Sequence, residues 1–166
     1  MIVRPIEAED LDVLYEIENE PGTWSVATPG GPYSHFALSR YIEQFGTDIF
    51  TSGQLRLMAC DDDGTPIGTL DLTNYSPTDR SAEVGIAVRA KYRGQGCGKR
   101  MLQMLEEYAS NVLNLRMLYA RVVESENPAS QSLFCGMGYE KVAVLPEWHF
   151  LGGSYVDIAV LRKLLS

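Results

Sequence analysis

The stretch Glu83-Val84-Gly85-Ile86-Ala87-Val88-Arg89-Ala90-Lys91-Tyr92-Arg93-Gly94-Gln95-Gly96-Cys97-Gly98-Lys99-Arg100 decides the fold of this chain. Residues 84–88 alternate larger apolar and small side chains, which is the period of a half-buried strand. Glycines then occupy every second position of 94–98, which indicates a turn. Beyond the turn, apolar residues recur three and four positions apart, so the pattern predicts an amphipathic helix over 96–112.

This turn has the properties of an anion-binding site. A glycine-lined turn that leads into a helix presents N–H groups without partners inside the helix, and the helix dipole favours negative charge there. Four basic residues, Lys91, Arg93, Lys99 and Arg100, fall within the same ten positions of a chain whose net charge is −8. The combination predicts that the turn binds a phosphate group.

The spacing narrows the choice of phosphate ligand. A Walker A loop would need glycine where Arg93 stands and Ser or Thr where Arg100 stands. The dinucleotide fingerprint G-x-G-x-x-G also fails, because Lys99 occupies its last glycine position. Residues 93–98 instead fit R-x-x-G-x-G between a strand and a helix, and this resembles the acetyl-CoA pyrophosphate loop of the GNAT family of N-acetyltransferases.

Length and composition are typical of one globular domain, which we expect to span 1–166. No apolar run approaches the length of a membrane helix, and residues 1–5 lack the apolar core of a secretory signal. The 3 cysteines are widely spaced, which fits a reducing compartment without a disulfide framework or a metal cluster. We therefore expect a cytoplasmic protein that uses no metal and has no membrane partner.

Charge is distributed unevenly along the chain. Residues 1–66 hold 12 acidic and 3 basic residues, net −9, whereas residues 67–166 hold 10 acidic and 11 basic residues, net +1. This balance argues against nucleic-acid binding, which needs a basic surface. The acidic part either steers a cationic acceptor towards the protein or simply solvates one helix face.

The rest of the pattern predicts short strands and helices in alternation. Helices are expected at 7–19, at 34–46 with Ser34 as N-cap, and at 129–135 with Asn127 as N-cap; strands are expected at 2–6, 55–60, 66–75, 116–123, 142–145, 149–151 and 155–161. The strands at 84–88 and 116–123 should be parallel, because a helix joins them.

This order of elements is the GNAT layout, so the resemblance extends over nearly the whole chain. It implies an α/β (α+β) fold with a mixed central sheet of about six to seven strands, a splayed parallel pair and about four flanking helices. Residues 127–130 and 136–139 (Asn-Pro-Ala-Ser and Gly-Met-Gly-Tyr) look like the family's N-x-x-[AS] and [LM]-G-[FY] segments. Residues 112–119 are most similar to the spermidine and ribosomal-protein acetyltransferase branch.

The resemblance also implies the parts of a site for acetyl-CoA. The backbone N–H near Val88 would polarise the thioester carbonyl where the parallel strands part. Asn127 and Ser130 would face the pantetheine arm and the nucleotide. The full set of residues expected at the cofactor is Ala87, Val88, Arg93, Gly94, Gln95, Gly96, Cys97, Gly98, Lys99, Asn127, Ser130 and Phe134.

An amine attacks a thioester only as the free base, and alkylamines are mostly protonated at neutral pH, so a proton acceptor is needed. Glu83 is the candidate general base, since family members often place a glutamate on this strand; the alternative is a solvent-facing strand residue. Family members often carry a tyrosine as general acid where this chain has Phe134. Either the thiolate leaves unaided, or Tyr119, Tyr155 or Cys135 protonates it.

The resemblance implies a primary amine as the acceptor, and a small amine or a polyamine is favoured. Trp24, Tyr33 and Tyr75 could contact it through cation–π interactions, although core or loop anchoring is the simpler role for each aromatic residue. The loop 29–33 reads Pro-Gly-Gly-Pro-Tyr, without the acids found there in spermidine-type members. Two alternatives stay open, a protein N-terminal acetyltransferase and a non-catalytic acyl-CoA-binding module. A homodimer through exposed strand edges is possible.

Overall fold

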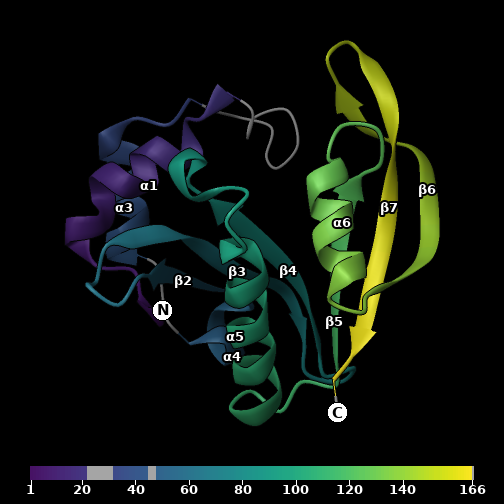
Figure 1. Ribbon diagram of the computed structural model, residues 1–166, viewed down its shortest axis with the longest axis horizontal. Coiled ribbons are helices and arrows are strands. Elements are labelled where there is room, and N and C mark those ends of the chain that lie inside the picture. Colours follow the sequence, from purple (N-terminus) through teal and green to yellow (C-terminus); the bar gives the residue numbers. More distant parts are fainter. Residues whose placement is uncertain (22–31, 45–47, 166) are drawn as a thin grey trace.

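The structure is a computed structural model that describes residues 1–21, 32–44 and 48–165, and its centre is a seven-stranded mixed sheet (Figure 1). The strands lie in the order β1-β2-β3-β4-β5-β7-β6. They are β1 (Ile2–Pro5), β2 (Leu55–Cys60), β3 (Pro66–Ser76), β4 (Ser81–Val88), β5 (Met117–Val123), β6 (Glu140–Leu151) and β7 (Ser154–Leu164). Only the pair β4–β5 is parallel. The predicted mixed sheet with one parallel pair is confirmed.

Five α-helices are described: α1 (Leu11–Glu18), α3 (His35–Gln44), α4 (Ile49–Ser52), α5 (Cys97–Asn111) and α6 (Pro128–Gly136). Figure 1 shows α5 and α6 on the near side of the sheet. Helices α1 and α3 contact each other and lie at the left of this view, beside β2. Short 3-10 turns at Ala8–Asp10 and Ala90–Tyr92 precede α1 and α5. Among the described residues, no helix is long and apolar enough to cross a bilayer.

The main core lies between α5 and the sheet. Every third or fourth residue of α5 is buried, among them Met101, Leu105 and Ala109. They pack against one face of the central strands, to which Leu70 of β3 and Val84 of β4 contribute. Complete burial of one such leucine stabilises the fold by about 2 kcal/mol, so this packing fixes the position of the first turn of α5.

Side chains of β4 alternate between the two faces of the sheet. Ala82 and Val84 join the core under α5. Glu83 and Gly85 therefore face the opposite side, where Gly85 lies across from Asp71 of β3. On the side opposite α5, β4 thus carries the carboxylate of Glu83, and β3 carries that of Asp71.

Asp10 anchors the first turn of the chain to β1. Its side chain is only 3% exposed and accepts hydrogen bonds from Arg4 Nη1 at 2.6 Å and from the Glu7 N–H at 2.9 Å. Burial alone would raise the pKa of Asp10, but these bonds outweigh burial and hold its pKa below the ordinary value. The buried carboxylate is therefore charged in the folded protein.

The structure corrects several predicted boundaries. The predicted strand 84–88 begins earlier, at Ser81, and the helix at 7–19 is divided into a 3-10 turn and α1. The short helix α4 was not predicted.

The predicted strands 142–145 and 149–151 are one strand, β6, whose pairing with β7 is irregular between Leu145 and His149. Pro146 interrupts the ladder without ending the strand, because β6 lies at the edge of the sheet, where a missing N–H is tolerated.

Candidate functional site

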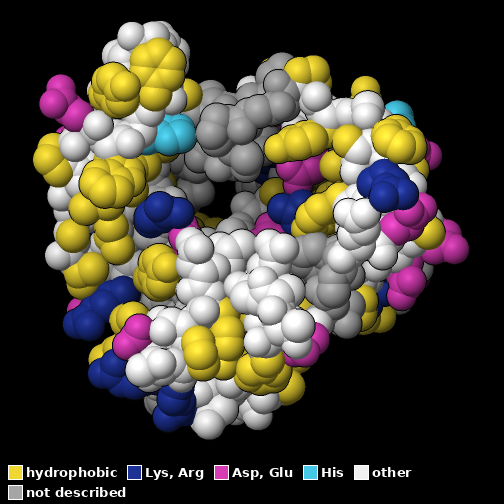
Figure 2. Space-filling view, turned by 180° about the vertical axis from the view of Figure 1, so that it is seen from behind, with side chains coloured by type: hydrophobic (Ala, Val, Ile, Leu, Met, Phe, Trp, Pro, Cys, Tyr) yellow, Lys and Arg dark blue, Asp and Glu magenta, His cyan; other side chains and the backbone are white. Residues whose placement is uncertain are grey.

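The parallel strands β4 and β5 part after three residues. Ser81 to Glu83 pair with Met117 to Tyr119, and no later residue of β4 pairs with β5, although these described strands run on to Val88 and Val123. Figure 1 shows the two strands diverging from their common end. In Figure 2 the molecule is hollowed in this region, between the half with β6 and β7 and the half with α1 and α3. The predicted splayed pair is confirmed, and we call the opening the wedge.

The wedge exposes a main-chain donor near the end of β4. The N–H of Arg89 donates to the Ile67 carbonyl of β3 at 3.0 Å. Because successive N–H groups of a strand point to opposite sides, the N–H of Val88 points away from β3 and into the wedge. Ala87 and Val88 are both only partly buried. The end of β4 can therefore donate a hydrogen bond to a group lying between the strands.

The turn before α5 is an array of backbone donors. Gly94 and Gly96 have φ angles of 72° and 78°, and a Cβ on either glycine would meet no atom within 4 Å. The first bond of the helix runs from the Arg100 N–H to the Gly96 carbonyl at 3.2 Å. Within the described part of the chain, no group accepts a hydrogen bond from the main-chain N–H of residues 94–99. The turn is therefore open and polar, as an anion site requires.

Basic side chains surround this turn in two different ways. Lys99 is exposed and has no acidic partner among the described residues. Arg93 instead donates from Nε to the Val88 carbonyl at 2.8 Å and from Nη1 to Glu20 at 2.8 Å. The guanidinium of Arg93 thus holds the turn, the end of β4 and the chain after α1 together. A bound anion would be held by the backbone N–H groups of the turn and not by Arg93, whose guanidinium already has these partners.

Helix α6 borders the same turn. A Cβ on Gly98 would lie 3.5 Å from Leu133 of α6 and 3.6 Å from Val88, so the start of α5, the second half of α6 and the end of β4 converge. Asn127 caps α6, because its side-chain oxygen accepts from the Ser130 N–H at 3.1 Å. The predicted N-cap is thus confirmed, while a contact of Asn127 and Ser130 with coenzyme A stays a prediction.

Phe134 is a buried residue of α6. It is 4% exposed, belongs to the main core and meets the ring of Tyr139 edge-on at 5.0 Å. Of the possible acids, Cys135 is exposed on α6, and Tyr155 is 64% exposed against Phe150 of the β6–β7 hairpin. Among the described residues, no contact places Cys135 or Tyr155 at the thioester position, and the Phe134 side chain cannot act as a general acid.

A polar cluster lies at the closed end of the wedge, around Glu83. Its Oε1 accepts from Arg121 Nε at 2.8 Å and its Oε2 from Asn74 Nδ2 at 2.7 Å. The Glu83 side chain is 13% exposed. Tyr119 is its register partner on β5. Glu83 is thus held as a hydrogen-bonded carboxylate where the strands begin to part.

Glu83 affects the pKa values of two neighbouring groups, Arg121 and Tyr119. Its hydrogen bond raises the pKa of Arg121. Burial, and then the negative charge of Glu83, raise the pKa of Tyr119, so this phenol stays protonated at neutral pH. Sequence reasoning did not identify Asn74 or Arg121, although the alternation along β5 places Tyr119 and Arg121 on one face.

A second ion-pair group lies on the same face of the sheet. Arg56 of β2 binds Asp71 through Nε and Nη2 and Glu18 of α1 through Nη1, the last at 2.7 Å. Gly85 packs directly against Asp71, since a Cβ there would lie 3.2 Å from the Asp71 Cβ. This face of the sheet therefore holds three carboxylates and two guanidinium groups.

Of the three predicted substrate-contacting aromatics, the structure describes two, and they have different neighbours. Trp24 lies outside the described residues. Tyr33 is held by the Asn19 side chain, through its N–H at 2.7 Å and its carbonyl at 2.9 Å. Tyr75 packs edge-on against Phe50 at 5.6 Å and contacts the core under α5, on the face opposite Glu83. A role for these residues at the acceptor stays a prediction.

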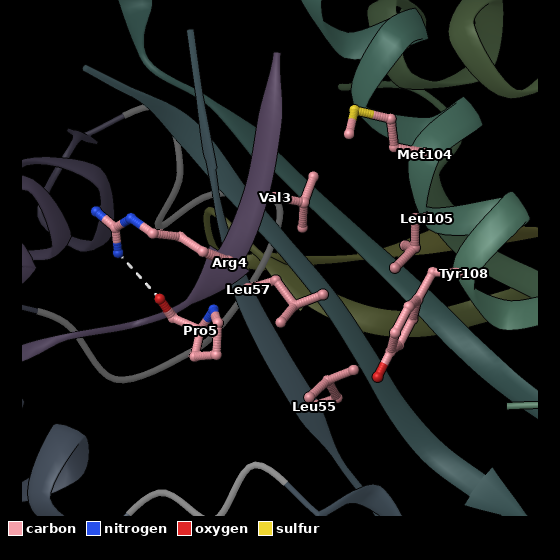
Figure 3. Close-up of a pocket in the computed structure, with 8 residues that line it drawn as sticks. All are labelled: Val3, Arg4, Pro5, Leu55, Leu57, Met104, Leu105 and Tyr108. Carbon is pink, nitrogen blue, oxygen red and sulfur yellow. Dashed lines mark hydrogen bonds between the residues drawn. The ribbon is translucent and has the colours of Figure 1, made fainter. Parts of the chain in front are cut away.

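Two cavities lie away from the wedge itself. One of about 390 Å³ is bordered by Glu16, Glu20 and Arg89, beside the turn before α5. The other, about 490 Å³, lies between β1, β2 and α5 (Figure 3). Its lining is mostly apolar, and Arg4, its charged residue, is paired with Asp10. In the described part of the chain, no cluster of His, Cys, Asp and Glu could hold a metal ion.

Comparison with known proteins agrees with this geometry. A family model described as "Acetyltransferase (GNAT) domain" matches residues 1–140. Spermidine N(1)-acetyltransferase of Vibrio cholerae is 25% identical over 166 residues, covering 100% of this chain and 94% of that protein. The Escherichia coli (strain K12) spermidine N(1)-acetyltransferase is 26% identical, covering 92% and 80%. The crystal structure of the Vibrio cholerae enzyme in complex with CoA and spermine matches with a TM-score of 0.88 at 24% identity, over 99% of this chain and 95% of that one.

Proposed function

The chain belongs to the GNAT acetyltransferase family, and we propose that its whole length forms one catalytic domain in which a primary amine directly attacks acetyl-CoA in a ternary complex. As a GNAT acetyltransferase it uses acetyl-CoA as its acyl donor. The observation that carries the proposal is the parting of β4 and β5 after Glu83 and Tyr119, beside an open turn of backbone donors. This geometry offers a place for a diphosphate, a place for a thioester and a nearby carboxylate.

The residues on the α5 side fit coenzyme A. The N–H groups of Gly94, Gln95, Gly96, Cys97, Gly98 and Lys99 would hold the diphosphate, since these described residues have no other acceptor for those groups. Ala87 and Val88 would line the pantetheine end, with the Val88 N–H donating to the thioester oxygen. Asn127 and Ser130 would lie along the other side of the arm. Arg93 would keep the turn in place through Val88 and Glu20.

Glu83 is the proposed proton acceptor, directly or through one water. The ammonium group of the acceptor gives one proton to the carboxylate, and the freed lone pair forms a bond to the acetyl carbon. The C–S bond breaks with its electron pair on sulfur, and the nitrogen loses its second proton to water. Arg121 and Asn74 hold both carboxylate oxygens of Glu83, and each oxygen keeps a further lone pair for this proton. Because Phe134 cannot protonate sulfur, coenzyme A would either leave as the thiolate or take a proton from Tyr119, Tyr155 or Cys135.

The proposed acceptor is a small primary amine, with polyamines favoured. Two curated relatives are spermidine acetyltransferases, and the face of the sheet with Glu83 carries three carboxylates against two guanidinium groups, which leaves one negative charge in excess. We further propose a cytoplasmic location and allow for a homodimer.

A thiol-release assay with acetyl-CoA tests the proposal, using spermidine, spermine, short diamines, monoamines and a peptide with a free N-terminus. Fastest turnover of a polyamine or diamine is expected. Preference for the peptide would instead favour an N-terminal acetyltransferase. A measurable CoA affinity without turnover of any amine would favour a non-catalytic binding module, the reading to which Phe134 points.

A further inference from the structure

The end of β4 lies over a glycine of β3. Gly68 is the register partner of Val88 and is buried. A Cβ on Gly68 would overlap the carbonyl oxygen of Ala87 and lie 3.1 Å from both the Ala87 carbonyl carbon and the Val88 Cα. All three are backbone atoms, which cannot swing aside as the tip of a long side chain can. Residue 68 must therefore lack a side chain for β4 to run as it does.

The overlapping oxygen belongs to the peptide that carries the donor of the wedge. Ala87 C=O and Val88 N–H are parts of one planar unit and point in opposite directions. Since the Ala87 oxygen occupies the space above Gly68, the Val88 N–H is aimed away from β3, towards the wedge. The next N–H, that of Arg89, is held by Ile67 of β3 at 3.0 Å. The orientation of this peptide is thus fixed from the β3 side.

We infer that Gly68 is a positioning residue for acetyl transfer, because its missing side chain sets the direction in which Val88 donates to the thioester oxygen. The inference rests on the proposed role of Val88. A methyl group at 68 would push the Ala87 oxygen out of its place, and the rigid peptide would turn the Val88 N–H by the same rotation. Glu83 lies at the other end of β4, where Arg121 and Asn74 hold its carboxylate, and the N–H groups of the diphosphate turn belong to residues 94–99, so both should keep their positions.

Gly68→Ala is the test, with Gly136→Ala as matched control, because a Cβ at 136 would meet no atom within 4 Å. Loss of one aligned donor to the developing oxyanion lowers kcat by about 100-fold. CoA lacks the acetyl carbonyl, so its affinity should change by less than about threefold, which is much smaller than the expected fall in kcat. In the absence of acceptor, infrared spectra of bound acetyl-CoA labelled with ¹³C at the carbonyl should show a lowered frequency in the unaltered chain and in Gly136→Ala, and a frequency near that of free acetyl-CoA in Gly68→Ala.

A lowered carbonyl frequency and an undiminished kcat in Gly68→Ala would overturn the inference while leaving the proposed function intact. An unshifted carbonyl in the unaltered chain would overturn the role of Val88 and the inference with it. Because the added methyl can also prevent folding, a crystal structure of the unaltered chain with CoA provides a second measurement. An Ala87 carbonyl lying in the plane of the sheet, with free space above Gly68, would refute the inference whether or not the variant folds.

Discussion

Replacing Glu83 by glutamine separates its proposed chemical role from its structural one. Gln keeps the shape of Glu and can still accept from Arg121, while Asn74 can reverse its amide to accept from the new NH₂ group. What disappears is the charge of a pair whose side chains are 13% and 45% exposed. A partly exposed pair of this kind contributes about 1 kcal/mol, so we expect Tm to fall by about 3 °C.

The expected effect on catalysis is much larger. Loss of a general base lowers kcat by about 100-fold or more, which corresponds to about 3 kcal/mol in the barrier. An alkylamine with a pKa near 10.4 gains about tenfold in free base for each pH unit between 7 and 10. The difference between Glu83→Gln and the unaltered chain should therefore shrink as pH rises.

Initial rates of thiol release between pH 6 and 10 measure this, with the exposed Glu9→Gln as control for the loss of one carboxylate. A deficit in Glu83→Gln that stays constant over this pH range would show that the variant is damaged structurally, and Glu83 would no longer be a candidate base. Full activity at pH 7 would exclude it outright.

Three further outcomes are expected. Gly96→Asp should abolish CoA binding in calorimetry, because it strains a residue at φ 78° and places a carboxylate where the diphosphate would lie; unchanged affinity would contradict the site. Arg4→Met should destabilise the protein by about 3 kcal/mol in urea at pH 7, since it leaves the buried Asp10 carboxylate without its partner. Because the folded pKa of Asp10 is lowered, the carboxylate stabilises the fold above about pH 4, and this contribution is lost as the pH falls further. The urea midpoints of Arg4→Met and of the unaltered chain should therefore converge in acid. A constant difference between the two midpoints down to about pH 3 would disprove the assignment. Leu105→Ala should lower the free energy of unfolding by about 3 kcal/mol, because it leaves a cavity in the core. Thermal unfolding should show the lower stability, while the rate of acetyl transfer at 15 °C, where the variant is folded, should equal that of the unaltered chain.

The parts of the site that are local in sequence could be predicted. The glycine turn, the strand before it and the helix after it follow from spacing within 83–112, and Asn127 caps α6 as its neighbours indicate. The splaying of the parallel pair followed only from resemblance. The residues of β4 and β5 alone do not predict where the pairing of the two strands ends.

The parts that depend on contacts distant in sequence could not be predicted. Glu83 and Arg121 are 38 positions apart, and their pairing requires the register of β4 against β5. The face on which Tyr75 lies could not be predicted either, for a different reason. Simple alternation from the buried Leu72 would place it on the face of Glu83, but Asn74 adopts φ 50° within a register shift. That irregularity turns Asn74 to Glu83 and Tyr75 to the core.

The irregular outer strand β6 also affects the protein's solubility. Val142, Val144, Trp148 and Phe150 leave it with an apolar and exposed surface at the margin of the sheet, where an incoming strand from another molecule could add on. Pro146 offers no N–H to such a strand, and the N–H of the next residue, Glu147, already donates to Asp157 at 2.8 Å. The same kink that breaks the ladder with β7 thus discourages open-ended stacking of the molecules into aggregates.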